Sequence, residues 1–343
     1  MRALALKGWM TMVALGATLL LTGCGPEQVN LDGKTMGTYY SIRYLTGDNT
    51  PSAETLQKEI DRRLEQVNDQ MSTYRPDSEL SRFNASREVD TPFPVSAATA
   101  KVVAEALRIN RVTDGALDVT VGPLVNLWGF GPEGRPDKVP SDVELAQRRA
   151  WTGIDKLAVQ GNALVKHIPE LYVDLSSIAK GYGVDVVAEY LQSQQINNYM
   201  VDIGGEVRTR GHNGKELPWR IAIERPNAGV EQRAQLVIQP GNMAIATSGD
   251  YRNYFEQNGV RYSHTIDPTT GRPIAHHLVS ITVIGPNCMT ADGLSTGLDV
   301  MGPDRALALA NLLGIPVFMI VKNGDVFEER YSNAFKPYLK KNQ

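Results

Sequence analysis

Hydrophobic positions along the chain follow two spacings, one typical of strands and one typical of helices. Apolar and polar residues alternate over residues 34–45, where β-branched and aromatic side chains are frequent, and this pattern predicts an antiparallel strand. Apolar residues spaced three and four apart follow Ser52 and Ser96, which predicts two helices that begin at these capping residues. The second helix is expected to end before Asp114 and Gly115.

Short strands dominate the sequence beyond residue 150. Alternating or β-rich runs predict strands over residues 157–159, 163–165, 171–175, 199–207, 220–224, 235–238, 260–266, 278–284, 316–321 and 325–329. Helices are predicted over residues 177–194 and 304–313 and from Thr290. The Gly- and Pro-rich residues 114–140 predict a structured loop system, followed by a short helix with Ser141 and Glu144 as a capping box. Because hairpin turns outnumber crossovers, the sequence predicts an α+β fold with mixed, largely antiparallel sheets and packed helices.

The first residues of the chain have the pattern of an export signal. Basic residues precede an apolar run over residues 9–21, which is shorter than the roughly 20 residues that cross a bilayer. The sequence Leu-Thr-Gly-Cys that ends at Cys24 is a lipobox, and acylation of that cysteine (palmitate among the chains) would anchor the protein. We expect a signal peptide over residues 1–23, a tether over residues 24–34 and a folded domain over residues 35–343 on the periplasmic side.

Net charge and cysteine content argue against nucleic-acid binding and against an internal disulfide. The formal net charge of −3 offers no basic footprint, so we expect no binding to nucleic acid. Once Cys24 carries lipid, Cys288 is the one cysteine left, which excludes a disulfide within the chain. Cys288 has no acid–base partner nearby in the sequence and is interpreted as a buried or semi-buried residue without a chemical role.

Candidate metal ligands occur in the last polar segment, residues 290–297. Asp292 and Thr296 are four residues apart, so on a helix they would lie on one face, about one turn of 5.4 Å apart. A carboxylate and a hydroxyl with no His or Cys beside them suit Mg²⁺, which takes oxygen ligands. Alternatively, Asp292 only stabilises the positive end of the helix dipole. The residues alone leave both interpretations open.

Candidate anion ligands occur where residues 171–175 lead into the next helix. Ser176 and Ser177 place hydroxyls and amides at a helix N-terminus, where anions bind well. Lys180 lies in the first turn, against the helix dipole, and a nearby phosphate or ribose would explain it. The alternative is an ordinary surface lysine.

Three further side chains have both a functional and a structural interpretation. Asp118, in a glycine-rich loop, either accepts hydrogen bonds from sugar hydroxyls or forms an Asx-type turn. Tyr74 either stacks on an aromatic ring of a ligand or is a half-buried structural tyrosine. His264, expected on a strand that ends at Asp267, is either a base or phosphate contact or a structural histidine.

Five polar segments and the lipobox, in this order, resemble the ApbE family. The segments are residues 34–38, 115–123, 173–181, 263–268 and 290–297. Members of that family are FAD:protein FMN transferases, once described as thiamine-biosynthesis lipoproteins, and the resemblance covers essentially the whole mature chain. It implies an ApbE-like, T-fold-related domain in which FAD would lie between two lobes.

The resemblance also implies roles for individual residues. Mg²⁺ would be bound by Asp292, Thr296 and a carbonyl at Ser177. His264 and Asp292 would be catalytic. The implied FAD contacts are Met36, Tyr74, Ala116, Leu117, Asp118, Asp174, Lys180, Ser263, His264 and Ile266.

The reaction expected from the resemblance is post-translational flavinylation. A Thr or Ser hydroxyl of a client protein would attack the FMN-side phosphorus of FAD, so that FMN is attached through a phosphoester and AMP leaves. The implied clients are flavin-carrying subunits of the sodium-pumping NADH:quinone reductase and of Rnf-type complexes, which favours the inner membrane over the outer. The alternatives are a periplasmic FAD pyrophosphatase and a non-catalytic FAD-binding lipoprotein.

Overall fold

An eight-stranded antiparallel sheet forms the centre of the molecule. The computed structural model describes residues 26–132, 134, 139–224, 234–249, 254–257, 260–324 and 326–339. The strands, in their order across the sheet, are β1 (Gln28–Thr35), β2 (Thr38–Leu45), β6 (Tyr199–Ile203), β7 (Glu206–Arg210), β10 (Ala244–Gly249), β15 (Leu278–Gly285), β16 (Val317–Asn323) and β17 (Val326–Tyr331). The predicted fold class, α+β with largely antiparallel sheets, is confirmed.

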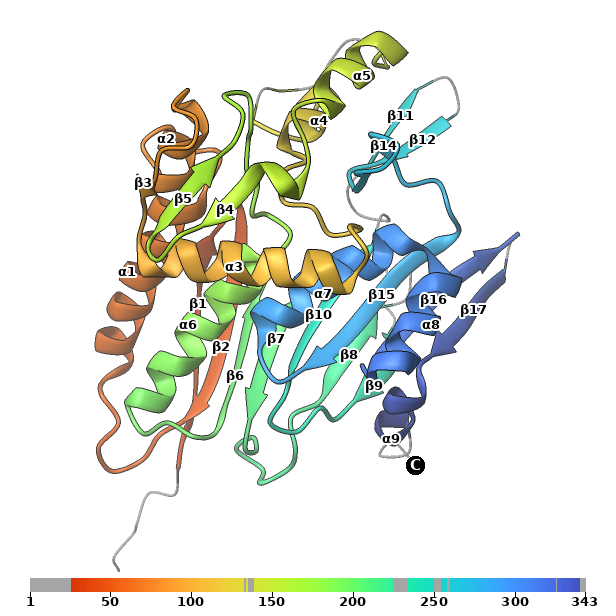
Figure 1. Ribbon diagram of the computed structural model, residues 1–343. Helices are drawn as coiled ribbons and strands as arrows, with labels where there is room; N and C mark the ends of the chain where they lie inside the picture. Colours follow the sequence, from red (N-terminus) through yellow and green to blue (C-terminus); the bar gives the residue numbers. More distant parts are fainter. Residues whose placement is uncertain are drawn as a thin grey trace, which may run out of the picture.

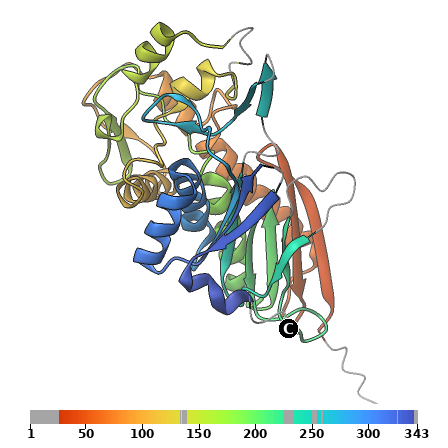
Figure 2. The same cartoon turned by 90° about the vertical axis from the view of Figure 1, so that its right-hand side faces the viewer.

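Helices cover one face of this sheet (Figures 1 and 2). The helices α1 (Ala53–Met71), α6 (Ala179–Ser193), α7 (Cys288–Met301) and α8 (Pro303–Leu313) lie on the strands, and α3 (Ala97–Val112) packs against α1 and α7. The opposite face packs partly against the hairpin of β8 (Ile221–Glu224) and β9 (Ala234–Ile238) and against Phe335 near the C-terminal α9 (Lys336–Leu339). Cys288 is completely buried at the start of α7, as expected.

Smaller elements gather beyond one end of the sheet, at the top of Figure 1. They are α2 (Glu79–Ala85), α4 (Gly122–Leu127), α5 (Asp142–Arg149), the sheet of β3 (Phe93–Pro94), β5 (Ala163–Lys166) and β4 (Leu157–Val159), and the hairpins of β11 (Tyr254–Gln257) with β12 (Val260–Ser263) and of β13 (Ile266–Asp267) with β14 (Arg272–Pro273). The indole of Trp128 donates a hydrogen bond to the Gly271 carbonyl at 2.8 Å and so joins the α4 region to the loop before β14.

The predicted strand over residues 34–45 is in fact a turn and one strand of a hairpin. Met36 and Gly37 have φ of 49° and 71° and form the two-residue turn between β1 and β2. Two positive φ angles match the twist of such hairpins, and only the second residue is a glycine. The tether predicted over residues 24–34 is wrong from Gln28 onward, because β1 pairs with β2 from there. Cys24 and the signal segment lie outside the described residues.

Local capping signals were correct for three helices and misleading for two. Ser52, Ser96 and Ser141 are the N-caps of α1, α3 and α5, the last with the predicted capping box. In contrast, α7 begins at Cys288 and is capped by Asn287 instead of beginning at Thr290. The helix predicted from residue 177 begins at Ala179.

The segment over residues 171–175 is buried but is not a strand. The Asn84 side chain accepts a hydrogen bond from the Val173 N–H and donates one to the Val173 carbonyl, both at 2.8 Å. These bonds satisfy the backbone in place of a neighbouring strand. The runs over residues 199–207 and 260–266 are each divided between two strands, β6 and β7, and β12 and β13.

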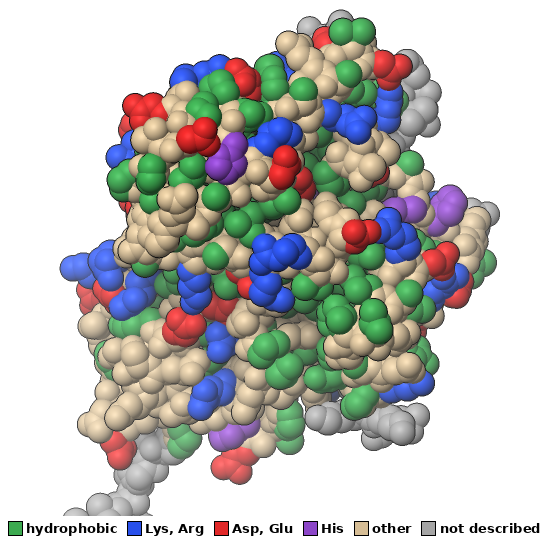
Figure 3. Space-filling model, in the orientation of Figure 1, with side chains coloured by type: hydrophobic (Ala, Val, Ile, Leu, Met, Phe, Trp, Pro, Cys, Tyr) green, Lys and Arg blue, Asp and Glu red, His purple; other side chains and the backbone are tan. Residues whose placement is uncertain are grey.

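Charges on the described surface are mixed. On the face shown in Figure 3, basic and acidic side chains are interspersed. Within the described residues, none of the helices combines the length and the apolar character needed to cross a membrane.

Candidate active site

A pocket of about 350 Å³ lies between the end of the sheet and the smaller elements beyond it. Its walls come from the loop after α3, the turn before α6, the first residue of β7, the end of β10, the segment between β12 and β13, and α7. The predicted site residues that line it are Tyr74, Ala116, Leu117, Asp118, Asp174, Ser177, Lys180, His264, Ile266, Asp292 and Thr296. Residues from five distant segments are therefore brought together.

A larger hollow of about 1080 Å³ adjoins this pocket. The two share Tyr74, Asp174, Ser176 and Lys180, so they are continuous. Met36, at the β1–β2 turn, lines the larger hollow. The structure therefore offers an elongated cleft, as an extended ligand requires.

One predicted contact, Ser263, does not line either cavity. Its side chain is buried, and its hydroxyl oxygen accepts a hydrogen bond from the Thr265 N–H at 3.1 Å. The side chain of Ser263 therefore holds the turn that presents its neighbour His264. The prediction of a direct ligand contact is not supported at this position.

Asp292 is a buried carboxylate at the junction of α6 and α7. It is 4% exposed, and its Oδ2 accepts a hydrogen bond from the Gly181 N–H at 2.8 Å. Burial raises the pKa of Asp292 to about 7; nearby Lys180 opposes this shift, and Glu206 adds to it. A carboxylate in this environment is stabilised as an anion by a nearby cation.

Lys180 pairs with a glutamate that the sequence did not reveal as a site residue. Its Nζ lies 2.6 Å from Oε1 of Glu206, the first residue of β7. Burial lowers the pKa of Lys180, but the carboxylates of Asp292 and Glu206 outweigh burial and raise it. The ion pair explains a lysine placed against the helix dipole, while the same lysine still lines both cavities.

The charges around Asp292 do not balance. Lys180 contributes one positive charge, whereas Glu206 and Asp292 contribute two negative charges when ionised. Oε2 of Glu206 is buried and finds no hydrogen-bond partner among the residues that the structure describes. Since uncompensated buried charge is costly, the pocket favours binding of one more cation.

The chemistry of the lining residues fits a magnesium ion. Ser177, Asp292 and Thr296 all line the smaller pocket and can supply a carbonyl, a carboxylate and a hydroxyl, which are oxygen ligands. The described part of the chain contains no group of three or more His, Cys, Asp and Glu side chains suited to a metal. The expected set needs only one carboxylate, so it does not depend on such a group.

Asp118 and Asp174 each stabilise their own loop. Oδ1 of Asp118 accepts hydrogen bonds from the Thr120 N–H at 2.8 Å and hydroxyl at 2.6 Å. Oδ1 of Asp174 accepts one from the Ser176 N–H at 2.9 Å. For Asp118 this is the Asx-type turn given as its structural interpretation, and both carboxylates also line the smaller pocket. The Asp174 N–H donates to the Val119 carbonyl at 2.8 Å and joins the two loops.

Two aromatic residues and His264 surround one side of the cleft. Tyr74 is 66% exposed, so the half-buried structural interpretation is wrong, and its hydroxyl donates to the Phe130 carbonyl at 3.3 Å. His264 lies in a bend between β12 and β13 and not on a strand as predicted. Its ring contacts that of Phe130 edge-on, with centroids 6.3 Å apart.

The end of β10 is a part of the site that the sequence did not indicate. Thr247, Ser248 and Gly249 line the smaller pocket. The Ser248 hydroxyl donates to Oδ2 of Asp299 at 3.0 Å, which ties β10 to α7. Polar residues that directly follow the apolar residues 244–246 were the available sequence signal for this part of the site. The stretch is too short to predict a strand.

A buried carboxylate, a lysine and a histidine lie around one end of an elongated cleft, as is typical of an enzyme active site. A model of the ApbE family matches residues 36–319. The FAD:protein FMN transferase of Vibrio cholerae serotype O1 is 63% identical over 339 residues, covering 98% of this chain and 100% of that protein. That of Escherichia coli strain K12 is 44% identical over 344 residues, covering 96% of this chain and 97% of its own.

Solved structures agree with these sequence relatives. A flavin transferase ApbE from Vibrio cholerae has a TM-score of 0.87 with this chain at 62% identity, covering 92% of this chain and 100% of that one. An apo flavinyl transferase ApbE from Pseudomonas stutzeri has a TM-score of 0.85 at 41% identity, covering 92% and 97%. The chain belongs to the ApbE family, which confirms the resemblance found in the sequence.

Proposed function

We propose that this protein transfers the FMN half of FAD to a Thr or Ser hydroxyl of a client protein, with release of AMP. The observation that carries the proposal is the buried Asp292 beside an excess of negative charge, at one end of a cleft large enough for an extended ligand. The activity named for the curated relatives supports flavin transfer from FAD.

The proposed reaction depends on magnesium, held by Asp292, Thr296 and the Ser177 carbonyl. When bound, Mg²⁺ would act as a Lewis acid on the FAD pyrophosphate and neutralise its charge. The protein's own contribution is positioning and electrostatic stabilisation, which provide most of the acceleration in phosphoryl-type transfers. Lys180 presents a positive charge to the pyrophosphate, and Glu206 holds that lysine in place.

The remaining lining residues would orient FAD and the client hydroxyl. The exposed ring of Tyr74 offers a stacking surface where the two cavities meet, which supports contact with one of the FAD ring systems. The loop of residues 116–118 lines the wall of the smaller pocket. His264 lines the same pocket as Asp292 and is our candidate for the base that takes the proton of the client hydroxyl.

A direct test is mass spectrometry of a flavin-carrying subunit of the sodium-pumping NADH:quinone reductase after incubation with the protein. We expect the subunit to gain one FMN, through a phosphoester, with equimolar AMP, when both FAD and Mg²⁺ are present. AMP and free FMN without a labelled subunit would identify a pyrophosphatase. FAD binding without any AMP would identify a binding protein with no chemistry.

His264→Ala should lower transfer by roughly 10²- to 10⁴-fold, as expected for loss of a general base. The measurement is the pH–rate profile with saturating FAD and client. If His264 is the base, the acidic limb of the wild-type profile disappears in the variant. A variant that keeps this limb and a near-normal rate would assign the proton to another acceptor and leave His264 a structural role against Phe130.

Anchoring by lipid at Cys24, on the periplasmic side of the inner membrane, is part of the same proposal. The lipobox supports it, and confinement with membrane-bound clients, including those of Rnf-type complexes, would raise the frequency of encounter. We expect Cys24→Ser to give an uncleaved or soluble protein in membrane fractionation. A processed Cys24→Ser protein that still sediments with membranes would overturn the anchor.

A further inference from the structure

We infer that Asp185 is a positioning residue that fixes α7 against α6 and β7, and thereby sets Asp292 and Thr296 in register with Ser177 and Lys180. This inference rests on the proposed function, because it assigns to Asp292 and Thr296 the role of metal ligands. Asp185 is absent from the walls of both cavities, so any effect on the site must pass through the helix that it holds.

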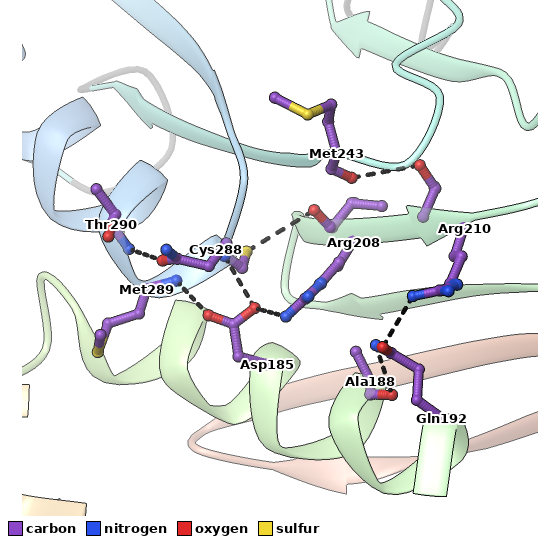
Figure 4. A network of polar contacts seen from close by, with 12 residues as sticks. Asp185, Ala188, Gln192, Arg208, Arg210, Met243, Cys288, Met289 and Thr290 are labelled. Atoms are coloured by element: carbon purple, nitrogen blue, oxygen red, sulfur yellow. Dashed lines mark hydrogen bonds and ion pairs between the residues drawn. The ribbon is translucent and has the colours of Figure 1, made fainter. Parts of the chain in front are cut away.

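Asp185 uses both carboxylate oxygens on partners from two other elements. It is buried on α6, with 4% exposure. Oδ1 accepts hydrogen bonds from Arg208 Nη1 at 2.6 Å and from the Cys288 N–H at 2.9 Å, and Oδ2 accepts one from the Met289 N–H at 2.9 Å. Figure 4 shows this carboxylate between the start of α7 and Arg208 on β7. It therefore satisfies the first two amides of α7, which have no partner within the helix.

Asp185 and the proposed metal ligand Asp292 join α6 and α7 by the same kind of contact, one helical turn apart. Gly181 and Asp185 are four residues apart on α6, and Cys288 and Asp292 are four residues apart on α7. The Gly181 N–H binds Asp292, and the Cys288 N–H binds Asp185. The two helices are thus joined by reciprocal bonds that lie four residues, about 6 Å, apart along their axes. A shift of α7 at Asp185 must also displace Asp292.

Two ion pairs of opposite polarity fix β7 on the same helix. Glu206 and Arg208 are two residues apart on β7 and therefore point to the same face of the sheet. Glu206 pairs with Lys180, and Arg208 pairs with Asp185, both at 2.6 Å. If β7 slid along α6, like charges would come together. The pair of Arg208 and Asp185 therefore fixes the register that holds Lys180 at the pocket.

The test is a magnesium titration of Asp185→Asn in the full chain, by calorimetry with FAD bound. The amide keeps the size of the side chain but places an N–H₂ where one of its acceptors was, so we expect Mg²⁺ affinity to fall about 10- to 100-fold, as for residues that orient metal ligands. Transfer should recover at high Mg²⁺ concentration, and FAD affinity measured in chelator should stay within about twofold of wild type. The effect is therefore on the metal and not on the flavin.

Thr209→Val is the matched control. Thr209 lies next to Arg208 on β7, is buried, and donates a hydrogen bond to the Gly241 carbonyl at 2.6 Å, away from α7. We expect a lower unfolding temperature with unchanged Mg²⁺ affinity. If Asp185→Asn behaves like this control, Asp185 is only structural and the inference fails.

Two further arms keep the test decisive. If Asp185→Asn does not fold, Arg208→Lys retains the charge but shortens the reach to Asp185, and we expect the same loss of Mg²⁺ affinity to a smaller degree; wild-type affinity there would overturn the inference. If the wild-type protein itself binds no Mg²⁺ and transfers flavin in chelator, the proposed metal role fails. If the wild-type protein binds Mg²⁺ and Asp185→Asn binds it equally well, only the inference about Asp185 fails.

Discussion

Asp292→Asn should abolish magnesium-dependent transfer while the protein still binds FAD. The substitution is close to isosteric, so the hydrogen bond from the Gly181 N–H can persist at the amide oxygen, whereas the negative charge is lost. We expect activity to fall by more than the roughly 10- to 100-fold typical of residues that only orient a ligand. The measurement is transfer rate against Mg²⁺ concentration, with FAD affinity determined in parallel.

The same carboxylate predicts how magnesium binding depends on pH. Burial raises the pKa of Asp292 to about 7 in the protein without a bound cation, so protons and Mg²⁺ compete for it near neutrality. Below about pH 7 the protonated form of Asp292 therefore predominates, whereas an ordinary aspartate would still be ionised. We therefore expect Mg²⁺ affinity to be weaker at pH 6 than at pH 8, and this difference to disappear in Asp292→Asn.

A control on the same helix separates the charge from the helix itself. Thr290→Val removes a hydroxyl that donates to Oε1 of Glu105 at 2.6 Å, near the start of α7 but outside both cavities. It should leave the magnesium response unchanged. An Asp292→Asn protein with wild-type activity that chelator still inhibits would place the cation elsewhere.

The sequence was most informative where a structural signal is local. The serine caps of α1, α3 and α5 depend on residues within three positions, and all three were predicted correctly. The start of α7 was missed because Asn287 and Thr290 are both good capping residues, and the choice depends on Asp185, which is 103 residues away from Cys288. Alternation across residues 34–45 concealed the turn because Met36 adopts a positive φ that usually marks glycine.

The site residues that were missed have no local signal. Glu206 belongs to the site because β7 places it against Lys180. Phe130 belongs to it because its ring contacts that of His264, which is far away in the sequence. The resemblance to a known family identified residues that touch the ligand or metal, such as Asp292 and His264. Residues that only hold those groups in place, such as Asp185, become visible only through their contacts.

Gly181→Ala should separate α6 from α7 and remove magnesium binding together with stability. A methyl group at this position would lie 2.3 Å from the Cys288 carbonyl oxygen and 2.7 Å from the Asp292 Cβ, and the first of these is backbone that cannot rotate away. Overpacking of this kind costs about 1–3 kcal/mol, which exceeds the roughly 1 kcal/mol that alanine gains over glycine within a helix. We expect a lower unfolding temperature and, because Asp292 moves with α7, no increase of that temperature on addition of Mg²⁺.

Gly47→Ala is the matched control for this substitution. The nearest atom to a methyl group there is Oγ1 of Thr50 at 3.7 Å, an ordinary contact, in a loop far along the chain from α6. Its unfolding temperature and its response to Mg²⁺ should match those of wild type. A Gly181→Ala protein with wild-type stability that Mg²⁺ still stabilises would mean that the two helices do not need this close approach to form the site. Loss of stability with an intact magnesium response would instead show that the close contact between α6 and α7 does not determine the geometry of the metal ligands.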